Sequence, residues 1–234
     1  MSLPNNRFYR LRAWLVHFYT SLGLVTGFFT LAALFSGDAH VFFIFQGVSL
    51  FIDATDGYFA RQWNVKVWAP ELDGRKLDDI TDYLNYTFLP IAFAFKFGLI
   101  SGPWTAVLAF VLITSIYGFC QNVAKTTDGY FTGFPNFWNI LVFYLYFFGL
   151  PVPFNSLILF VFAVLIFVPV KYLSFSSPIL RGITFAISLL YGLVLFLIVI
   201  NFSNVDVRLV WLSLLGPIYY VVTSVYLHFS GQSV

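Results

Sequence analysis

Eight apolar runs dominate this chain, and most of them are about as long as a membrane-spanning helix. Crossing the hydrocarbon core of a bilayer takes about 20 apolar residues, with a range of roughly 17–25. The composition agrees, because 60% of the residues are hydrophobic and 9% are charged, whereas a soluble domain carries about 25% charged residues. We therefore expect an all-α integral membrane protein with one transmembrane domain over residues 1–234. The predicted spans are residues 13–36, 39–61, 77–100, 104–124, 137–150, 155–172, 179–202 and 207–229.

The distribution of Lys and Arg predicts the orientation of these spans. With the N-terminus placed in the cytosol, ten of the twelve basic residues fall on the cytosolic side, and only Lys96 and Arg208 fall outside. Such an excess of basic residues is typical of cytosolic loops. An even number of spans returns the C-terminus to the cytosol as well. The first run is too long for a signal peptide and no small-residue cleavage site follows it, so we expect a retained first helix.

Charged residues interrupt the second and third predicted spans near their cytosolic ends. The two stretches are "DATDGYFAR" at 53–61 and "GRKLDDITD" at 74–82. An aspartate or arginine at the centre of a membrane helix costs about 2.5–3.5 kcal/mol, and such residues usually face a polar cavity and have a function. The two stretches are therefore the best candidates for a functional site.

The spacing of the aspartates places them on two helix faces. Asp53 and Asp56 are three residues apart and Asp78 and Asp82 are four apart, so each pair shares a face. Two antiparallel neighbours can turn these faces together, and four clustered carboxylates need cations or protons to offset their repulsion. Oxygen ligands at this density suit Mn²⁺ or Mg²⁺, and two such ions are the usual device for displacement at phosphorus. Asp79 points about 100° away from Asp78 on the same helix, and we interpret it as solvated or as an outer residue that supports the metal ligands.

Small and basic residues accompany the aspartates. Gly57 and Ala60 lie on the face of Asp53, where a missing or minimal side chain lets a bulky ligand approach the helix backbone. Arg61 follows at the end of the helix and can offer a fork of donors to a phosphate.

These residues together carry a resemblance to a known family. Asp53-x2-Asp56-Gly57-x2-Ala60-Arg61, followed by Gly74-x3-Asp78-x3-Asp82, resembles the signature of the CDP-alcohol phosphotransferases. The common form of that signature has a shorter gap than the twelve residues, 62–73, found here. The longer gap and the "FTGFPNFWN" stretch at 131–139 resemble the subfamily of bacterial phosphatidylcholine synthases.

The resemblance implies roles for individual residues. It implies a six-helix core with a cytosol-facing cavity in a bacterial inner membrane, two Mn²⁺ or Mg²⁺ ions, and a homodimer. The substrates would be CDP-diacylglycerol and choline. Asp82 would be the catalytic base as well as a metal ligand. The full metal set would be Asp53, Asp56, Asp78 and Asp82, and the nucleotide-binding set would be Asp53, Asp56, Gly57, Ala60, Arg61 and Gly74.

Further candidates come from the chemistry of the two substrates. A quaternary ammonium binds to aromatic faces, and Tyr86, one turn beyond Asp82, and Trp138 are the candidates for choline. A lipid phosphate needs cationic donors at cytosolic helix ends. The candidates for that role are Lys125, Lys171 and Arg181.

Two other functions compete with this interpretation. A sibling phosphatidyltransferase would use another alcohol, such as serine. A divalent-cation transporter would use the aspartates as an ion path. An ion path has no need of Gly57 and Ala60 on the ligand face, and Arg61 at its mouth would repel cations, so the sequence favours the enzyme.

Overall fold

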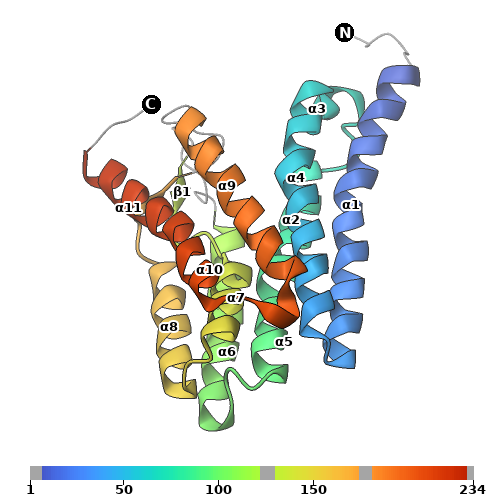
Figure 1. Cartoon of the computed structure of the whole chain (residues 1–234). Helices are drawn as coiled ribbons and strands as arrows, with labels where there is room; N and C mark the ends of the chain where they lie inside the picture. The colour runs from blue at the N-terminus through green and yellow to red at the C-terminus, as the bar shows by residue number, and fades with distance from the viewer. Residues whose placement is uncertain (1–6, 122–129, 174–180, 231–234) are drawn as a thin grey trace. The chain divides into compact units, whose positions relative to one another are not determined.

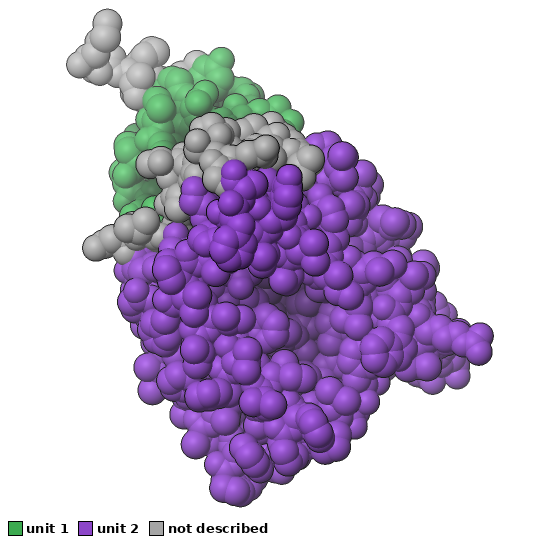
Figure 2. Space-filling model, turned by 90° about the vertical axis from the view of Figure 1, so that its left-hand side faces the viewer, with its two compact units in different colours: residues 1–89 green, residues 90–234 purple. Residues whose placement is uncertain are grey.

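A computed structural model of the chain describes residues 7–121, 130–173 and 181–230. It is built almost entirely of helices (Figure 1), so the prediction of an all-α protein is confirmed. The chain divides into two compact units, residues 1–89 and residues 90–234, which Figure 2 distinguishes by colour. Every residue of the 53–82 signature lies in the first unit. The expectation of a single catalytic domain stays a prediction.

The apolar character of the described helices fits a membrane protein. Within the described residues, four helices are long and apolar enough to cross a membrane, and two shorter apolar helices accompany them. The four are Arg7–Ser36, Gly102–Cys120, Gly182–Ile200 and Val207–Ser230. Many large apolar side chains on these helices are exposed, as lipid-facing residues are. The chain is therefore a multi-pass membrane protein.

The first unit holds two long helices and a shorter, interrupted one. A tight turn at Gly37, with φ of +74°, joins the two long helices, and the Asp38 side chain caps the second by accepting a hydrogen bond from the Val41 N–H. Asp73 caps the helix that begins at Gly74 in the same way, accepting from the N–H groups of Arg75 and Lys76. The elements are α1 (Arg7–Ser36), α2 (Ala39–Gln62), α3 (Val65–Trp68), α4 (Gly74–Asp82) and the π-helical turn η1 (Tyr83–Phe88).

Small residues let α1 approach α4 and η1 closely. A Cβ on Gly23 would lie 2.4 Å from the Thr81 Cγ2, and one on Gly27 would lie 3.1 Å from the Asn85 Oδ1. The Asn85 side chain also donates hydrogen bonds to the carbonyls of Gly23, at 2.9 Å, and of Thr81, at 3.0 Å. Glycines four residues apart commonly allow such helix packing in membranes. These contacts hold α1 directly against α4 and η1.

The residues between the two halves of the signature, 62–73, are folded against α1. Ala13 and Val16 of α1 are buried with Val65 and Ala69 of this segment, and several aromatic side chains surround them. The Arg10 side chain pairs with that of Glu71 at the surface. The twelve-residue gap in the signature is therefore a folded segment that packs on the N-terminal half of α1.

The second unit is also mainly helical. Its elements are α5 (Leu89–Lys96), η2 (Gly102–Trp104), α6 (Thr105–Cys120), β1 (Phe131–Thr132), α7 (Trp138–Phe148), α8 (Val152–Leu165), β2 (Lys171–Tyr172), α9 (Arg181–Ile200), η3 (Phe202–Asn204), α10 (Val207–Ser213) and α11 (Leu215–Ser230). The strands β1 and β2 form one short antiparallel pair, in which Phe131 lies opposite Tyr172.

The sixth predicted span, residues 155–172, is wrong at its C-terminal end. The helix α8 stops at Leu165, and residues 171–172 form β2 instead. The Leu165 carbonyl, at the end of α8, accepts a hydrogen bond of 3.1 Å from the Phe134 N–H, which lies close after β1 in the chain. Gly133, with φ of +79°, makes this possible, because a Cβ there would lie 2.2 Å from the Ile166 carbonyl oxygen. Pro169 cannot continue a helix.

Candidate functional site

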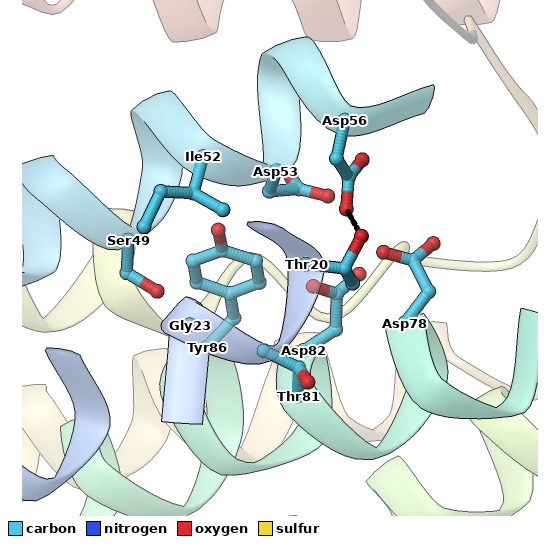
Figure 3. A pocket seen from close by; sticks show the side chains of 10 residues that line it. All are labelled: Thr20, Gly23, Ser49, Ile52, Asp53, Asp56, Asp78, Thr81, Asp82 and Tyr86. Carbon is cyan, nitrogen blue, oxygen red and sulfur yellow. Dashed lines mark hydrogen bonds between the residues drawn. The ribbon is translucent and has the colours of Figure 1, made fainter. Parts of the chain in front are cut away.

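Three carboxylates of the first unit meet at one point. Asp53 comes from α2, and Asp78 and Asp82 come from α4. One oxygen from each lies within 4.8 Å of the others, and all three side chains are half-buried (Figure 3). Like charges this close in a membrane protein are stable only with protons or cations between them. A set of three carboxylate oxygens is the donor chemistry that Mg²⁺ and Mn²⁺ prefer, so these residues fit such an ion.

Asp56 lies beside this cluster but is held separately. Its side chain is 6% exposed, and its Oδ2 accepts a hydrogen bond of 2.7 Å from the Thr20 Oγ1, drawn as a dashed line in Figure 3. The structure therefore gathers three of the four predicted metal ligands and places the fourth against α1. Asp56 as a metal ligand stays a prediction.

The four aspartates line one pocket with about 190 Å³ of empty space, including its open mouth. Its walls come from α1, α2, α4 and η1. The lining residues are Thr20, Gly23, Ser49, Ile52, Asp53, Asp56, Asp78, Thr81, Asp82 and Tyr86. Thr20 and Gly23 lie outside the signature, and we did not predict them. The spacing Thr20-x2-Gly23-x3-Gly27, which puts small residues on one face of α1, was the available signal.

A π-helical turn begins directly after Asp82. It covers Tyr83–Phe88, and its residues Asn85, Tyr86 and Thr87 are buried. Such turns inside helices are rare and occur often at functional sites. Here the turn carries Tyr86 into the pocket, where its ring lies near Ser49 and Asp53 (Figure 3).

The small residues of the signature have different neighbours. A Cβ on Gly57 would meet only the Arg61 guanidinium, at 3.3 Å, so a ligand can approach the backbone there. Ala60 instead packs against the apolar cluster that joins α1 to α3. A Cβ on Gly74 would lie 3.0 Å from the Cε1 of the buried His17. Gly57 therefore suits a ligand, whereas Ala60 and Gly74 also have a packing reason to be small.

Asp79 lies apart from the pocket. Its side chain is 42% exposed and lies 3.9 Å from the guanidinium of Arg75, one turn earlier. It does not belong to the pocket lining, although it is the chain neighbour of Asp78.

The second candidate for choline, Trp138, is enclosed by the second unit. Its side chain is fully buried, and its indole N–H donates to the Ser115 hydroxyl at 2.8 Å and to the Asn136 Oδ1 at 3.2 Å. Its ring packs edge-on against Phe134. Because this side chain has no exposed surface, the geometry argues against a direct contact with choline.

The candidates for a lipid phosphate are only partly described. The Lys171 ammonium lies 5.4 Å from the centroid of the Tyr130 ring, at the short β-pair of the second unit. Lys125 lies outside the described residues, as does the side chain of Arg181 at the start of α9. All three remain predictions.

Comparison with known proteins gives matches along most of the chain, although no family model matches it. A phosphatidylcholine synthase of Legionella pneumophila is 39% identical over 212 residues, which cover 86% of this chain and 82% of that protein. A phosphatidylcholine synthase of Borreliella burgdorferi is 35% identical over 184 residues, covering 78% of this chain and 79% of that protein. One of Rhizobium johnstonii is 29% identical over 221 residues, covering 92% and 90%. The similarity therefore extends far beyond the signature.

The contact between Gly74 and His17 generates a test of packing. We expect Gly74→Ala to lower the thermal unfolding temperature, because the new Cβ would crowd the His17 ring and overpacking costs about 1–3 kcal/mol. Gly57→Ala is the control and should unfold near the wild-type temperature. In a His17→Ala background, Gly74→Ala should cost little further stability. A wild-type unfolding temperature for Gly74→Ala alone would show that the packing explanation is wrong.

Proposed function

The chain belongs to the phosphatidylcholine synthase family, and we propose that it transfers the phosphatidyl group of CDP-diacylglycerol to choline with release of CMP. The observation that carries the proposal is the cluster of Asp53, Asp78 and Asp82 in a pocket of a chain whose relatives bear that name. Transfer at phosphorus needs a site that tolerates several negative charges and can take a proton from an alcohol. With cations bound to its carboxylates, the pocket would offer both.

The carboxylates would hold the cations that the reaction needs. Asp53, Asp78 and Asp82 would bind Mn²⁺ or Mg²⁺, and Asp56, on the same pocket wall, would complete a site for two ions. When bound, such ions offset the charge of the carboxylates and of the substrate phosphates. In the ion-free pocket, the closeness of the three carboxylates opposes their full ionisation.

Asp82 is our candidate for the catalytic base. It follows Asp78 by one turn on the same face of α4 and lies directly before the π-helical turn. In the reaction, the choline oxygen forms a bond to the phosphorus that carries the diacylglycerol, and the bond from that phosphorus to the CMP oxygen breaks. The hydroxyl proton passes to the Asp82 carboxylate. A positioned carboxylate of this kind contributes about 10²–10⁴-fold to a rate.

The two substrates would occupy different parts of the site. We place the cytidine nucleotide near Gly57, whose backbone is open to a ligand, and near the exposed Arg61 at the end of α2. We place choline near Tyr86, the aromatic side chain of the pocket lining. An aromatic face attracts a quaternary ammonium by about 0.5–2 kcal/mol.

We also propose where the enzyme works. The distribution of basic residues supports a site that faces the cytosol, and the bacterial relatives support a bacterial cytoplasmic membrane. A site near the cytosolic surface of the membrane suits the reaction, because the tails of the lipid substrate stay in the bilayer while choline arrives from water. The homodimer that the family resemblance implies stays a prediction.

Membranes from a host that makes no phosphatidylcholine test the function directly. With the chain expressed, labelled choline, CDP-diacylglycerol and Mn²⁺, we expect labelled phosphatidylcholine and stoichiometric CMP. Excess chelator should abolish the product, and added Mn²⁺ or Mg²⁺ should restore it, because the clustered carboxylates need cations. Labelled serine should be a poor substrate. If serine were used as efficiently as choline, the chain would be a sibling phosphatidyltransferase.

Asp78 and Asp79 form a matched pair for testing the metal cluster. Asp78→Asn should lower activity by about 100-fold, since it removes a charge from the group of three carboxylates. Asp79→Asn should lower activity far less, because that side chain is 42% exposed and lies near Arg75. Activity is measured across a Mn²⁺ titration, with membrane insertion checked for both variants. Equal losses in the two variants would contradict the assignment.

The role of Asp82 is tested by separating binding from turnover. Asp82→Asn should lower kcat by about 10²–10⁴-fold, because the choline hydroxyl loses its base. It should still bind CDP-diacylglycerol, since the other carboxylates remain. Asp53→Asn should weaken binding of CDP-diacylglycerol and Mn²⁺ together. Titration of purified variants is run beside turnover assays. Near-normal turnover in Asp82→Asn would rule it out as the base.

A further inference from the structure

Two hydrogen bonds of the same length join α1 to α2 at neighbouring residues. The Thr20 Oγ1 donates to the Asp56 Oδ2 at 2.7 Å, and the hydroxyls of Tyr19 and Thr55 lie 2.7 Å apart. Only the first bond belongs to the pocket, whose lining includes Thr20 and Asp56 but neither Tyr19 nor Thr55. Removing each bond in turn can therefore distinguish the contribution of α1 to helix packing from its contribution to the pocket.

The Thr20 hydroxyl is used differently from other threonines of its helix. The Thr26 hydroxyl donates to the Gly23 carbonyl at 2.8 Å, and that of Thr30 donates to the Thr26 carbonyl at 2.9 Å. This return to the helix's own backbone is the ordinary choice of a threonine in a helix. Thr20 instead directs its one donor across to a carboxylate, and both side chains are buried, at 7% and 6% exposed.

We propose that Thr20 is a positioning residue for the substrate and metal site, acting through Asp56. By binding one oxygen of the carboxylate, it restricts the side-chain rotamer of Asp56. Asp56 thereby stays at the pocket wall, next to the cluster of Asp53, Asp78 and Asp82, as a preset fourth carboxylate. This inference rests on the proposed function only where it concerns catalysis, since the positioning itself concerns cation binding.

Physical reasoning gives the size of the effect. A hydrogen bond to a charged group is stronger than one between neutral groups, and it also removes the freedom of a carboxylate to rotate. Outer partners that orient metal-binding carboxylates typically contribute about 10- to 100-fold to metal affinity or activity. Valine has nearly the shape of threonine but no hydroxyl, so Thr20→Val removes the hydrogen bond with little change in volume.

The experiment measures Mn²⁺ binding to the purified full chain by electron paramagnetic resonance, without substrate, beside turnover. Thr20→Val should weaken Mn²⁺ binding by about 10-fold or more and lower kcat/KM in step. Thr20→Ser keeps the hydroxyl and should restore most of both. Tyr19→Phe removes the neighbouring bond between the same helices, outside the pocket, and should change Mn²⁺ affinity by less than about twofold. Thermal unfolding of each variant reports any general loss of packing.

Several outcomes would overturn the inference. Wild-type Mn²⁺ affinity and turnover in Thr20→Val would do so, and so would equal losses in Tyr19→Phe, which would reduce Thr20 to helix packing. If Thr20→Val fails to fold, Thr20→Ala takes its place. In an Asp56→Asn background the Thr20 substitution should have no further effect on Mn²⁺ affinity, and additive losses would contradict the coupling. Failure of the proposed function looks different, since the wild type would then bind Mn²⁺ but make no phosphatidylcholine.

Discussion

The repulsion among Asp53, Asp78 and Asp82 is the constraint around which the first unit is arranged. Three carboxylate oxygens within 4.8 Å of one another are unfavourable in any low-dielectric setting unless cations or protons intervene. A membrane helix gains nothing in stability from such a cluster, and each charge costs several kcal/mol to keep there. The proposed function accounts for this cost, because carboxylates held this close would bind divalent cations, which would in turn hold phosphate groups.

The geometry that maintains this cluster comes from α1, which contributes no carboxylate. Gly23 and Gly27 have no side chains, so α1 can pack directly against the side chains of Thr81 in α4 and of Asn85 in η1. Asn85 then ties the two together by donating to the Gly23 carbonyl. One turn before Gly23, the Thr20 hydroxyl joins α1 to Asp56 of α2, so the same part of α1 contacts both helices that carry the aspartates. Packing and electrostatics are thus coupled, because a wider α1 contact would move a pocket wall.

The sequence predicted a membrane protein and most of its helices, because apolar runs of this length rarely occur outside membrane-spanning helices. It also predicted that Asp53, Asp56, Asp78 and Asp82 would gather, because helical spacing puts each pair on one face, and three of the four do meet. It did not predict the end of α8, where contacts from the distant residues Gly133 and Phe134 override an apolar run. Nor could spacing distinguish Asp56 from the other carboxylates, since that depends on a partner on another helix. The burial of Trp138 likewise depends on tertiary contacts that no local pattern contains.

A sequence signature records packing and chemistry together, and the structure separates them. Beside the α-carbon of Gly57 there is open space apart from the flexible Arg61 guanidinium, so a ligand can occupy that space. Gly74 faces the buried His17 ring, and Ala60 packs against the apolar cluster that joins α1 to α3, so both also have a packing reason to be small. The three positions look alike in a motif, yet substitutions there should act through different steps. A loss of activity at Gly74 is therefore not evidence for a ligand contact until folding and packing have been measured.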